Sequence, residues 1–232
     1  MKIYDYRNLR INNITQPEYK HILLLLYWPF YGLAFLTLER FLNLNYHTVE
    51  CSLDRRIPFC EFFVIPYYFW FLFIAWMIVY TFFYDIPAFK KFSWFIIITY
   101  TVTCVFYIIY PTKQMLRPDT FERNNIFTQI VGMLYSFDTN TNVCPSLHVI
   151  GSMAVTFTAW SSKRYGTRGW RAAFVIMCIL INLSTVFLKQ HSVIDAILGL
   201  AVSFITYPFI FAKKKQKKSE QEKSEEKQTV TQ

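Results

Sequence analysis

The chain has 232 residues, of which 54% are hydrophobic, 20% aromatic and only 17% charged, with a formal net charge of +9. A soluble domain of this size could not bury so much apolar surface, and its apolar residues come in blocks long enough to cross a bilayer. The composition therefore excludes an ordinary soluble domain. It predicts an all-α fold, a polytopic membrane helix bundle.

Six apolar blocks indicate six transmembrane helices within a membrane domain that covers residues 22–212. The blocks lie at roughly 22–41, 62–84, 92–110, 145–162, 170–188 and 191–212. Residues 1–21 form a polar lead without the apolar core of a signal peptide, so we expect the first block to be a retained anchor. Residues 213–232 are rich in Lys, Glu, Ser and Gln and are predicted to be a disordered basic tail.

The positive net charge could suggest a nucleic-acid partner, but the distribution of the charges argues for topology instead. Six spans place both termini on one side, and that side holds seventeen of the 24 Lys and Arg residues. They are Lys2, Arg7, Arg10, Lys20, Lys90, Lys91, Lys163, Arg164, Arg168, Arg171 and seven lysines after residue 212. This positive-inside bias predicts a cell-membrane protein with both termini in the cytoplasm and no nucleic-acid partner.

The first outer loop, about 42–61, contains Cys51 and Cys60. They could form a disulfide in an oxidising compartment, and free thiols are the alternative. No cysteine or histidine spacing in the chain is typical of a metal site, so we expect neither a metal nor a cofactor.

Two connections follow in chain order. We expect a short inner turn from Asp85 to Phe92 between the second and third spans. Residues 111–143 then form the longest non-apolar connection, and long loops that are not linkers tend to carry function. The apolar run from Ile126 to Tyr135 within it is consistent with a helix lying along the membrane interface.

Polar groups of catalytic types gather at the ends of the predicted spans, and the topology places all of them at the outer face. They are Lys113, Arg117, Ser146, His148, Lys189, His191 and Asp195. We expect Pro145 to start the fourth span, so that Ser146 and nearby backbone N–H groups would face a bound anion. Fixed cations beside that helix start would complete a phosphate site.

His191 and Asp195 are four residues apart, so they share a face if one helix runs through both. A carboxylate at one imidazole nitrogen leaves the other nitrogen free to accept a proton or attack phosphorus. This pair is the candidate catalytic centre.

The C-terminal half, about 110–200, resembles the type 2 phosphatidic acid phosphatase superfamily. That pattern has three parts: Lys, six residues and Arg-Pro; then Pro-Ser-Gly-His; then Ser-Arg, five residues, His, three residues and Asp. The chain has the corresponding residues in the same order: Arg117-Pro118, Pro145-Ser146-Leu147-His148, and Ser184 followed by His191 and Asp195.

The chain also departs from this pattern. Tyr110 stands where the first Lys is expected, and Lys113 is only four residues before Arg117. Leu147 replaces Gly, and Thr185 replaces the Arg of the third motif. The last two changes resemble the inositol phosphorylceramide synthase branch.

The resemblance implies a role for each candidate residue. His191 would be the nucleophile that forms a phosphohistidine, Asp195 would orient it, and His148 would protonate the leaving oxygen. Arg117 and Ser146 would hold the phosphate, and Lys113 and Lys189 would replace the displaced family cations. The expected activity is a metal-independent cleavage of a lipid phosphate, such as a phosphatidate or a polyprenyl phosphate, at the outer membrane face.

Other functions stay open at this point. Water or an alcohol could take up the phosphoryl group, so a phosphatase and a phosphotransferase of the phosphorylceramide-synthase type are both compatible with the motifs. A non-enzymatic membrane protein is the third alternative, either a scaffold or a haem carrier that uses His148 and His191. A haem pair would not need Asp195 or the cations.

Overall fold

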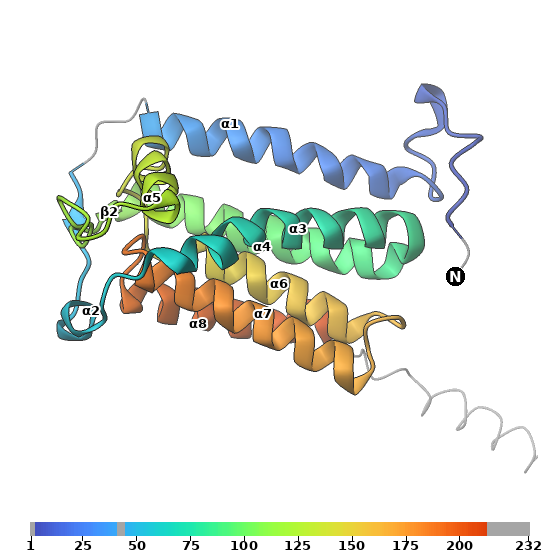
Figure 1. Ribbon diagram of the computed structural model, residues 1–232. Coiled ribbons are helices and arrows are strands. Elements are labelled where there is room, and N and C mark those ends of the chain that lie inside the picture. Colours follow the sequence, from blue (N-terminus) through green and yellow to red (C-terminus); the bar gives the residue numbers. More distant parts are fainter. Residues whose placement is uncertain (1–2, 41–44, 213–232) are drawn as a thin grey trace, which may run out of the picture.

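The computed structural model describes residues 3–40 and 45–212, so the predicted disorder of 213–232 lies outside the described residues. The described chain is mostly helical (Figure 1). Its α-helices are α1 (Tyr27–Arg40), α2 (Ser52–Arg56), α3 (Val64–Tyr84), α4 (Ile86–Ile109), α5 (Ile126–Phe137), α6 (Leu147–Ser161), α7 (Arg168–Phe187) and α8 (Val193–Phe211). Short 3₁₀ turns are η1 (Ile11–Asn13), η2 (Lys20–Leu26) and η3 (Glu61–Phe63), and the strands are β1 (His47–Thr48) and β2 (Thr112–Lys113).

Five helical segments in the described chain are long and apolar enough to cross a membrane. They are Lys20–Arg40, Glu61–Tyr84, Ile86–Ile109, Arg168–Phe187 and Val193–Phe211. The predicted all-helical fold is therefore confirmed, and it contains helices that are able to span a membrane. The fourth predicted span forms only α6, whose 15 residues extend about 22 Å, so the structure gives five candidate spans where six were expected.

Helix α6 forms the centre of the bundle and packs against α3, α4, α7 and α8. Twelve of its 15 residues are buried, and Gly151 leaves the space that the side chains of Tyr100 in α4 and Trp70 in α3 occupy. A helix that is covered on all sides by other helices does not need the length or the apolarity of a lipid-facing span. Burial rather than lipid exposure explains the mixed composition of α6.

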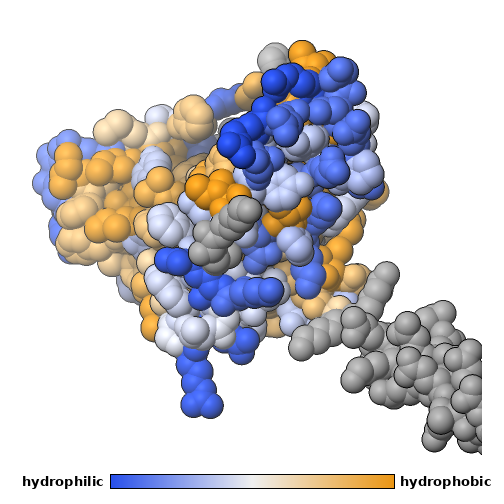
Figure 2. All heavy atoms as spheres, turned by 90° about the vertical axis from the view of Figure 1, so that its right-hand side faces the viewer, coloured by the Kyte–Doolittle hydropathy of each residue, from blue (hydrophilic) through white to orange (hydrophobic). Residues whose placement is uncertain are grey.

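The bundle has two distinct ends (Figure 1). At one end the N-terminal segment meets α3, where the N–H of Tyr4 donates to the carbonyl of Phe83 at 2.8 Å, and Lys91 lies 5.9 Å from the ring of Phe211 at the end of α8. Figure 2 looks onto this end and shows hydrophilic side chains gathered over it. The opposite end carries α2, β2 and α5, together with the starts of α6 and α8.

The first outer loop and the 111–143 connection are joined at this second end by a small parallel sheet. Strands β1 and β2 pair with His47 opposite Thr112 and Thr48 opposite Lys113. The helix predicted within the connection is confirmed as α5, whose start is capped by the side chain of Asn125. Both loops therefore have fixed positions above the starts of α6 and α8.

Two predicted helix starts were wrong. An inner turn was expected from Asp85 to Phe92, but only Asp85 separates α3 from α4, which already begins at Ile86. The carboxylate of Asp85 caps α4 by accepting from Ala88 N at 3.2 Å, and Pro87 in the first turn also favours a helix start. Pro145 does not begin the fourth helix, because Ser146 keeps an extended backbone as the N-cap and α6 begins at Leu147.

Candidate active site

The starts of α6 and α8 meet at the loop-covered end of the bundle and bring four predicted site residues together. The backbone N–H of Ser146 donates to the carbonyl oxygen of Asp195 at 3.0 Å, which joins the two helix starts directly. His148 and His191 face each other across this junction, with ring centroids 5.8 Å apart and planes inclined at 62°. At this separation the two imidazoles are direct neighbours in an edge-to-face arrangement, so both can act at one site.

His191 and Asp195 are in contact, although not on one continuous helix as expected. Ser192 is the N-cap of α8, so His191 lies in the preceding loop. The carboxylate of Asp195 reaches back to accept from Ser192 N at 2.9 Å and also lies 3.3 Å from Nδ1 of His191. This helix-cap geometry, rather than a shared helix face, holds the pair together and leaves Nε2 of His191 without a partner among the described residues.

His148 is held by aromatic rings rather than by a carboxylate. Its imidazole lies between Tyr67 and Trp70 of α3, with centroid distances of 4.5 and 4.4 Å. Its Nε2 is buried and has no hydrogen-bond partner among the described residues. A ring fixed in this way, with an unused nitrogen beside a second histidine, is suited to giving or accepting a proton.

Ser146 offers a free hydroxyl at the start of α6. The residue is fully buried, and its Oγ has no hydrogen-bond partner within the described chain. Because α6 begins one residue later, the first backbone N–H groups of the helix lie beside this hydroxyl. Buried donors at a helix N-terminus are a favourable setting for an anion.

Arg117 is fixed mainly by the 111–143 connection. Its guanidinium donates to the carbonyls of Tyr135, Asp138 and Thr139 and to the side-chain oxygen of Gln190. It also lies over the ring of Tyr135 at 4.6 Å, and burial lowers its pKa from the usual value. Its Nε is buried without a partner among the described residues, which leaves one donor available next to the His191 loop.

The two candidate lysines lie in different surroundings. Lys113 is half-buried in β2, and its ammonium makes no hydrogen bond or ion pair with the residues that the structure describes. The ammonium of Lys189 instead donates to the backbone carbonyls of Asp54 at 2.6 Å and Ile57 at 2.5 Å. Burial lowers the pKa of Lys189, and the nearby charge of Asp54 opposes this effect.

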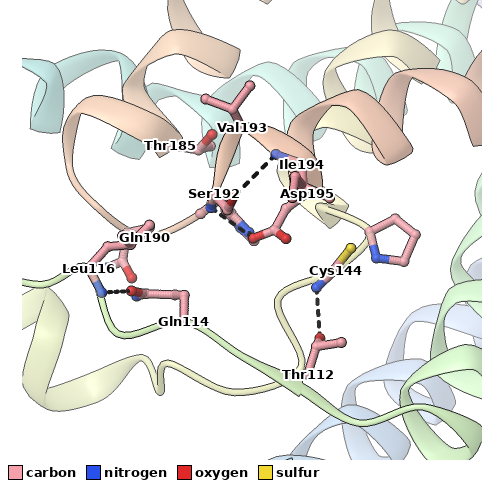
Figure 3. Close-up of polar contacts among 12 residues, drawn as sticks. Thr112, Gln114, Leu116, Cys144, Thr185, Gln190, Ser192, Val193, Ile194 and Asp195 are labelled. Atoms are coloured by element: carbon pink, nitrogen blue, oxygen red, sulfur yellow. Dashed lines mark hydrogen bonds and ion pairs between the residues drawn. The ribbon is translucent and has the colours of Figure 1, made fainter. Parts of the chain in front are cut away.

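Polar residues that sequence reasoning did not single out support the loop between α7 and α8, residues 188–192. The amide nitrogen of Gln114 donates to the carbonyl of Lys189 at 2.8 Å, and its oxygen accepts from Leu116 N at 2.6 Å. Figure 3 shows Gln114 beside Gln190, with Ser192 and Asp195 at the start of α8. Nothing in the sequence around Gln114 indicated this role.

A second group of missed residues surrounds His148. Tyr67 and Trp70 lie in an aromatic-rich span whose rings an interfacial belt would explain, but both contact the imidazole. The hydroxyl of Tyr67 donates to the carboxylate of Asp138 at 3.1 Å, and burial raises the pKa of Asp138.

All five cysteines are free thiols in the structure. They include Cys51 and Cys60, for which a disulfide was one of the two expected alternatives.

Comparison with known proteins gives one family match. The family model described as the PAP2 superfamily matches residues 33–209, which is most of the chain and contains all seven predicted site residues. No curated protein and no solved structure matches the chain. The match runs from α1 to α8 and therefore spans both helix starts that carry the histidines.

Proposed function

The chain belongs to the PAP2 superfamily, whose members are phosphatases and phosphotransferases, and we propose that it cleaves a lipid phosphate through a phosphohistidine. The observation that carries this proposal is the arrangement of His191, with Asp195 at its Nδ1, opposite His148. A phosphate ester has a poor leaving group and requires a nucleophile on one side and an acid on the other. The two histidines can supply both.

In the first half of the reaction, Nε2 of His191 attacks phosphorus and forms an N–P bond while the ester P–O bond breaks. The leaving oxygen takes a proton from His148, which must enter the reaction protonated. Asp195 holds the imidazole of His191 in orientation and stabilises the positive charge that the ring acquires.

In the second half, His148 accepts a proton from an incoming hydroxyl group. The oxygen of that group attacks phosphorus, the N–P bond breaks and His191 is regenerated. Water as the acceptor makes the enzyme a lipid phosphate phosphatase. A lipid or sugar alcohol as the acceptor makes it a phosphotransferase. Leu147 and Thr185, which replace the Gly and Arg of the family motifs, favour this alternative because they resemble the inositol phosphorylceramide synthase branch.

The phosphate is held by Ser146, the first N–H groups of α6, Nε of Arg117 and the ammonium of Lys113. Two of these groups support the proposal directly, because Ser146 Oγ and Arg117 Nε are buried donors without partners in the described chain. All of these groups can donate to a bound anion. They would neutralise the equatorial oxygens in the transition state. Lys189 is assigned to the support of the α7–α8 loop, because backbone carbonyls already engage its ammonium.

The membrane arrangement is part of the same proposal. We propose that α6 is the sixth membrane segment, packed between four of the five longer helices, α3, α4, α7 and α8. The described chain starts and ends, at residues 3 and 212, at one end of the bundle, and the histidines lie at the opposite end. The excess of Lys and Arg assigns the first end to the cytoplasm and the second to the outside. The lipid substrate then reaches the site from the outer leaflet of the cell membrane.

Phosphate release from a panel of lipid phosphates tests the proposal. Purified full-length protein in detergent is incubated with phosphatidate and polyprenyl phosphate, with and without candidate alcohol acceptors, and His191→Ala is the matched control. We expect turnover that disappears in the control, as free phosphate or as a phosphorylated alcohol. A Soret band in the purified protein, with no turnover of any lipid phosphate, would favour the haem carrier instead.

A further inference from the structure

The first outer loop contains a fully buried carboxylate that neither the motifs nor the proposed reaction uses. Asp54 lies in α2 and is 0% exposed, while its neighbours Arg55 and Arg56 are exposed to solvent. A carboxylate is buried at a large energetic cost unless it is paired or hydrogen-bonded. The hydrogen-bond partners of Asp54 therefore indicate which part of the molecule α2 stabilises.

The partners of Asp54 are the first residues of α8. One carboxylate oxygen accepts from the hydroxyl of Ser192 at 2.7 Å, and the other accepts from the backbone N–H of Val193 at 2.8 Å. The N–H of Cys51 also donates to the carboxylate at 2.7 Å and holds α2 in place. A negative charge at a helix N-terminus is favourable, and here it comes from a segment about 140 residues away in the sequence.

Asp54 and Asp195 contact the same residue from two sides. The side chain of Ser192 donates to Asp54, while the backbone N–H of Ser192 donates to Asp195, the partner of His191. The hydroxyl of Ser192 also accepts from Ile194 N at 3.1 Å. Because His191 directly precedes Ser192, a shift of Ser192 moves the nucleophile and its carboxylate partner together.

The loop between α7 and α8 is also held in place before His191, at Lys189. Lys189 has a backbone φ of +53°, in the left-handed region that a residue with a side chain adopts only when its surroundings hold it there. Its ammonium donates to the carbonyls of Asp54 and Ile57, and its own carbonyl accepts from Gln114. Contacts with the first outer loop therefore fix the chain both before and after the histidine.

We propose that Asp54 is a positioning residue for the nucleophile, and that the first outer loop sets the place of His191 by clamping Ser192 and Val193. The proposal rests on the proposed phosphohistidine function for its kinetic consequence. In-line attack requires the reacting atoms at about 3–3.5 Å, and a misplacement of about 1 Å costs on the order of a hundredfold in rate. Asp54 touches neither histidine, so its effect must act through the position of the loop.

Two variants loosen the clamp in different ways, and the chain offers a matched control for each. Asp54→Asn keeps the shape of the side chain but places an amide donor against Ser192 or Val193. Its control is Glu61→Gln, because Glu61 is also a buried carboxylate of the first outer loop but contacts Asn125 and Arg123. Both variants are made in the full-length protein in detergent, and thermal unfolding compares their stabilities.

The second variant, Val193→Pro, removes the backbone donor to Asp54 and leaves the carboxylate in place. Proline is well tolerated at the first helical position, and the extended backbone of Ser192 (φ −72°, ψ 157°) suits a residue before proline. Its control is Arg168→Pro, at the first position of α7 and the other end of the bundle, where Thr167 has φ −73° and ψ 156°. This pair decides the question if Asp54→Asn does not fold.

Two measurements separate positioning from simple stability. Single-turnover trapping of phosphohistidine should be slower by about 10–100-fold in Asp54→Asn and Val193→Pro, with little change in KM. The rate at which diethyl pyrocarbonate modifies His191, measured by mass spectrometry without substrate, should change in the same two variants. Glu61→Gln and Arg168→Pro should resemble wild type in both measurements.

The outcomes distinguish this proposal from the proposed function. If Asp54→Asn and Val193→Pro match their controls in the modification rate of His191, the positioning role of Asp54 is wrong whatever the activity. If wild type traps no phosphohistidine, the proposed function fails, yet the modification rates still decide whether Asp54 positions the loop.

Discussion

The backbone N–H of Ser146 and the carbonyl oxygen of Asp195 are joined by a 3.0 Å hydrogen bond, which connects the first turn of α6 to the first turn of α8. One helix start carries the proposed acid and the phosphate-binding hydroxyl, and the other follows the proposed nucleophile. The separation of the two histidines therefore depends on how closely these two helices pack.

Gly199 is the residue that permits this close packing. A Cβ at position 199 would lie 3.0 Å from the carbonyl oxygen of Ser146 and 3.0 Å from Cβ of Val149, so α8 would have to move away from α6. We expect Gly199→Ala to destabilise the protein by about 1–3 kcal/mol. We also expect it to lower kcat by about tenfold or more, since the reacting groups separate.

Gly32→Ala is the matched control, because a Cβ at position 32 would meet nothing within 4 Å. Thermal unfolding and lipid phosphate turnover of both variants check the prediction. Equal activities in Gly199→Ala and Gly32→Ala would show that the α6–α8 distance does not limit the reaction.

The pH dependence of stability should report the state of Asp54. Burial alone raises the pKa of this carboxyl, but hydrogen bonds from Val193, Ser192 and Cys51 outweigh it and leave the pKa below the usual value. A carboxyl whose pKa is lower in the folded state stabilises the fold above its unfolded pKa of about 3.9, and this contribution disappears as the pH falls through the folded pKa. Wild type should therefore lose stability below about pH 4.

The Asp54→Asn variant isolates this contribution. The difference in Tm between wild type and Asp54→Asn should be constant from about pH 5 to 7 and should shrink as the pH falls below about 4. Thermal unfolding in one detergent across this range measures it. A difference that grows on acidification would mean that Asp54 is not held as a carboxylate.

Much of the fold and part of the site were predictable from local patterns. The apolar blocks predicted the membrane bundle, and the spacing of His191 and Asp195 predicted their contact, although a helix cap rather than a helix face produces it. The proximity of His148 to His191 followed from two span ends at one membrane face. These features depend on the spacing of apolar and polar residues and on the order of the spans, both of which can be derived from a single sequence.

Other features depend on contacts between distant segments and carry no local signal. From the sequence, Lys189 is expected to be a free cation beside a histidine. In the structure its ammonium donates to the backbone carbonyls of Asp54 and Ile57, more than 130 residues earlier in the chain. Asp54 itself stands before two exposed arginines and reads as a surface charge. The start of α4, by contrast, could have been predicted from the sequence. Asp85 followed by Pro87 is a local N-cap signal that the predicted inner turn overlooked.

Labelling of single cysteines tests the proposed topology. Both termini are expected in the cytoplasm and residues 119–125 outside, because of the distribution of Lys and Arg. An impermeant maleimide applied to intact cells should label a cysteine placed in 119–125 and should not label one placed near the C-terminus. Labelling of the C-terminal position from outside would reverse the proposed orientation.

Activity should persist in excess EDTA. The proposed mechanism neutralises the phosphate with Arg117, Lys113 and the donors at the start of α6, and it assigns no step to a metal ion. Phosphate release measured before and after chelation should agree within about twofold. Loss of activity on chelation that Mg²⁺ restores would replace the histidine mechanism with a metal-assisted one.

The two histidines should have separable kinetic roles. His191→Ala removes the nucleophile, so no acid-labile, base-stable phosphate should be trapped from labelled substrate. Asp195→Asn should keep the fold but lose about 10²–10⁴ in kcat, since the imidazole loses its orienting carboxylate. His148→Ala should mainly slow departure of the leaving group. A nitrophenyl phosphate should therefore regain part of the lost rate, because its nitrophenolate leaving group departs without protonation. Trapped phosphate that survives in His191→Ala, or a His148→Ala defect that is equal for poor and good leaving groups, would contradict these assignments.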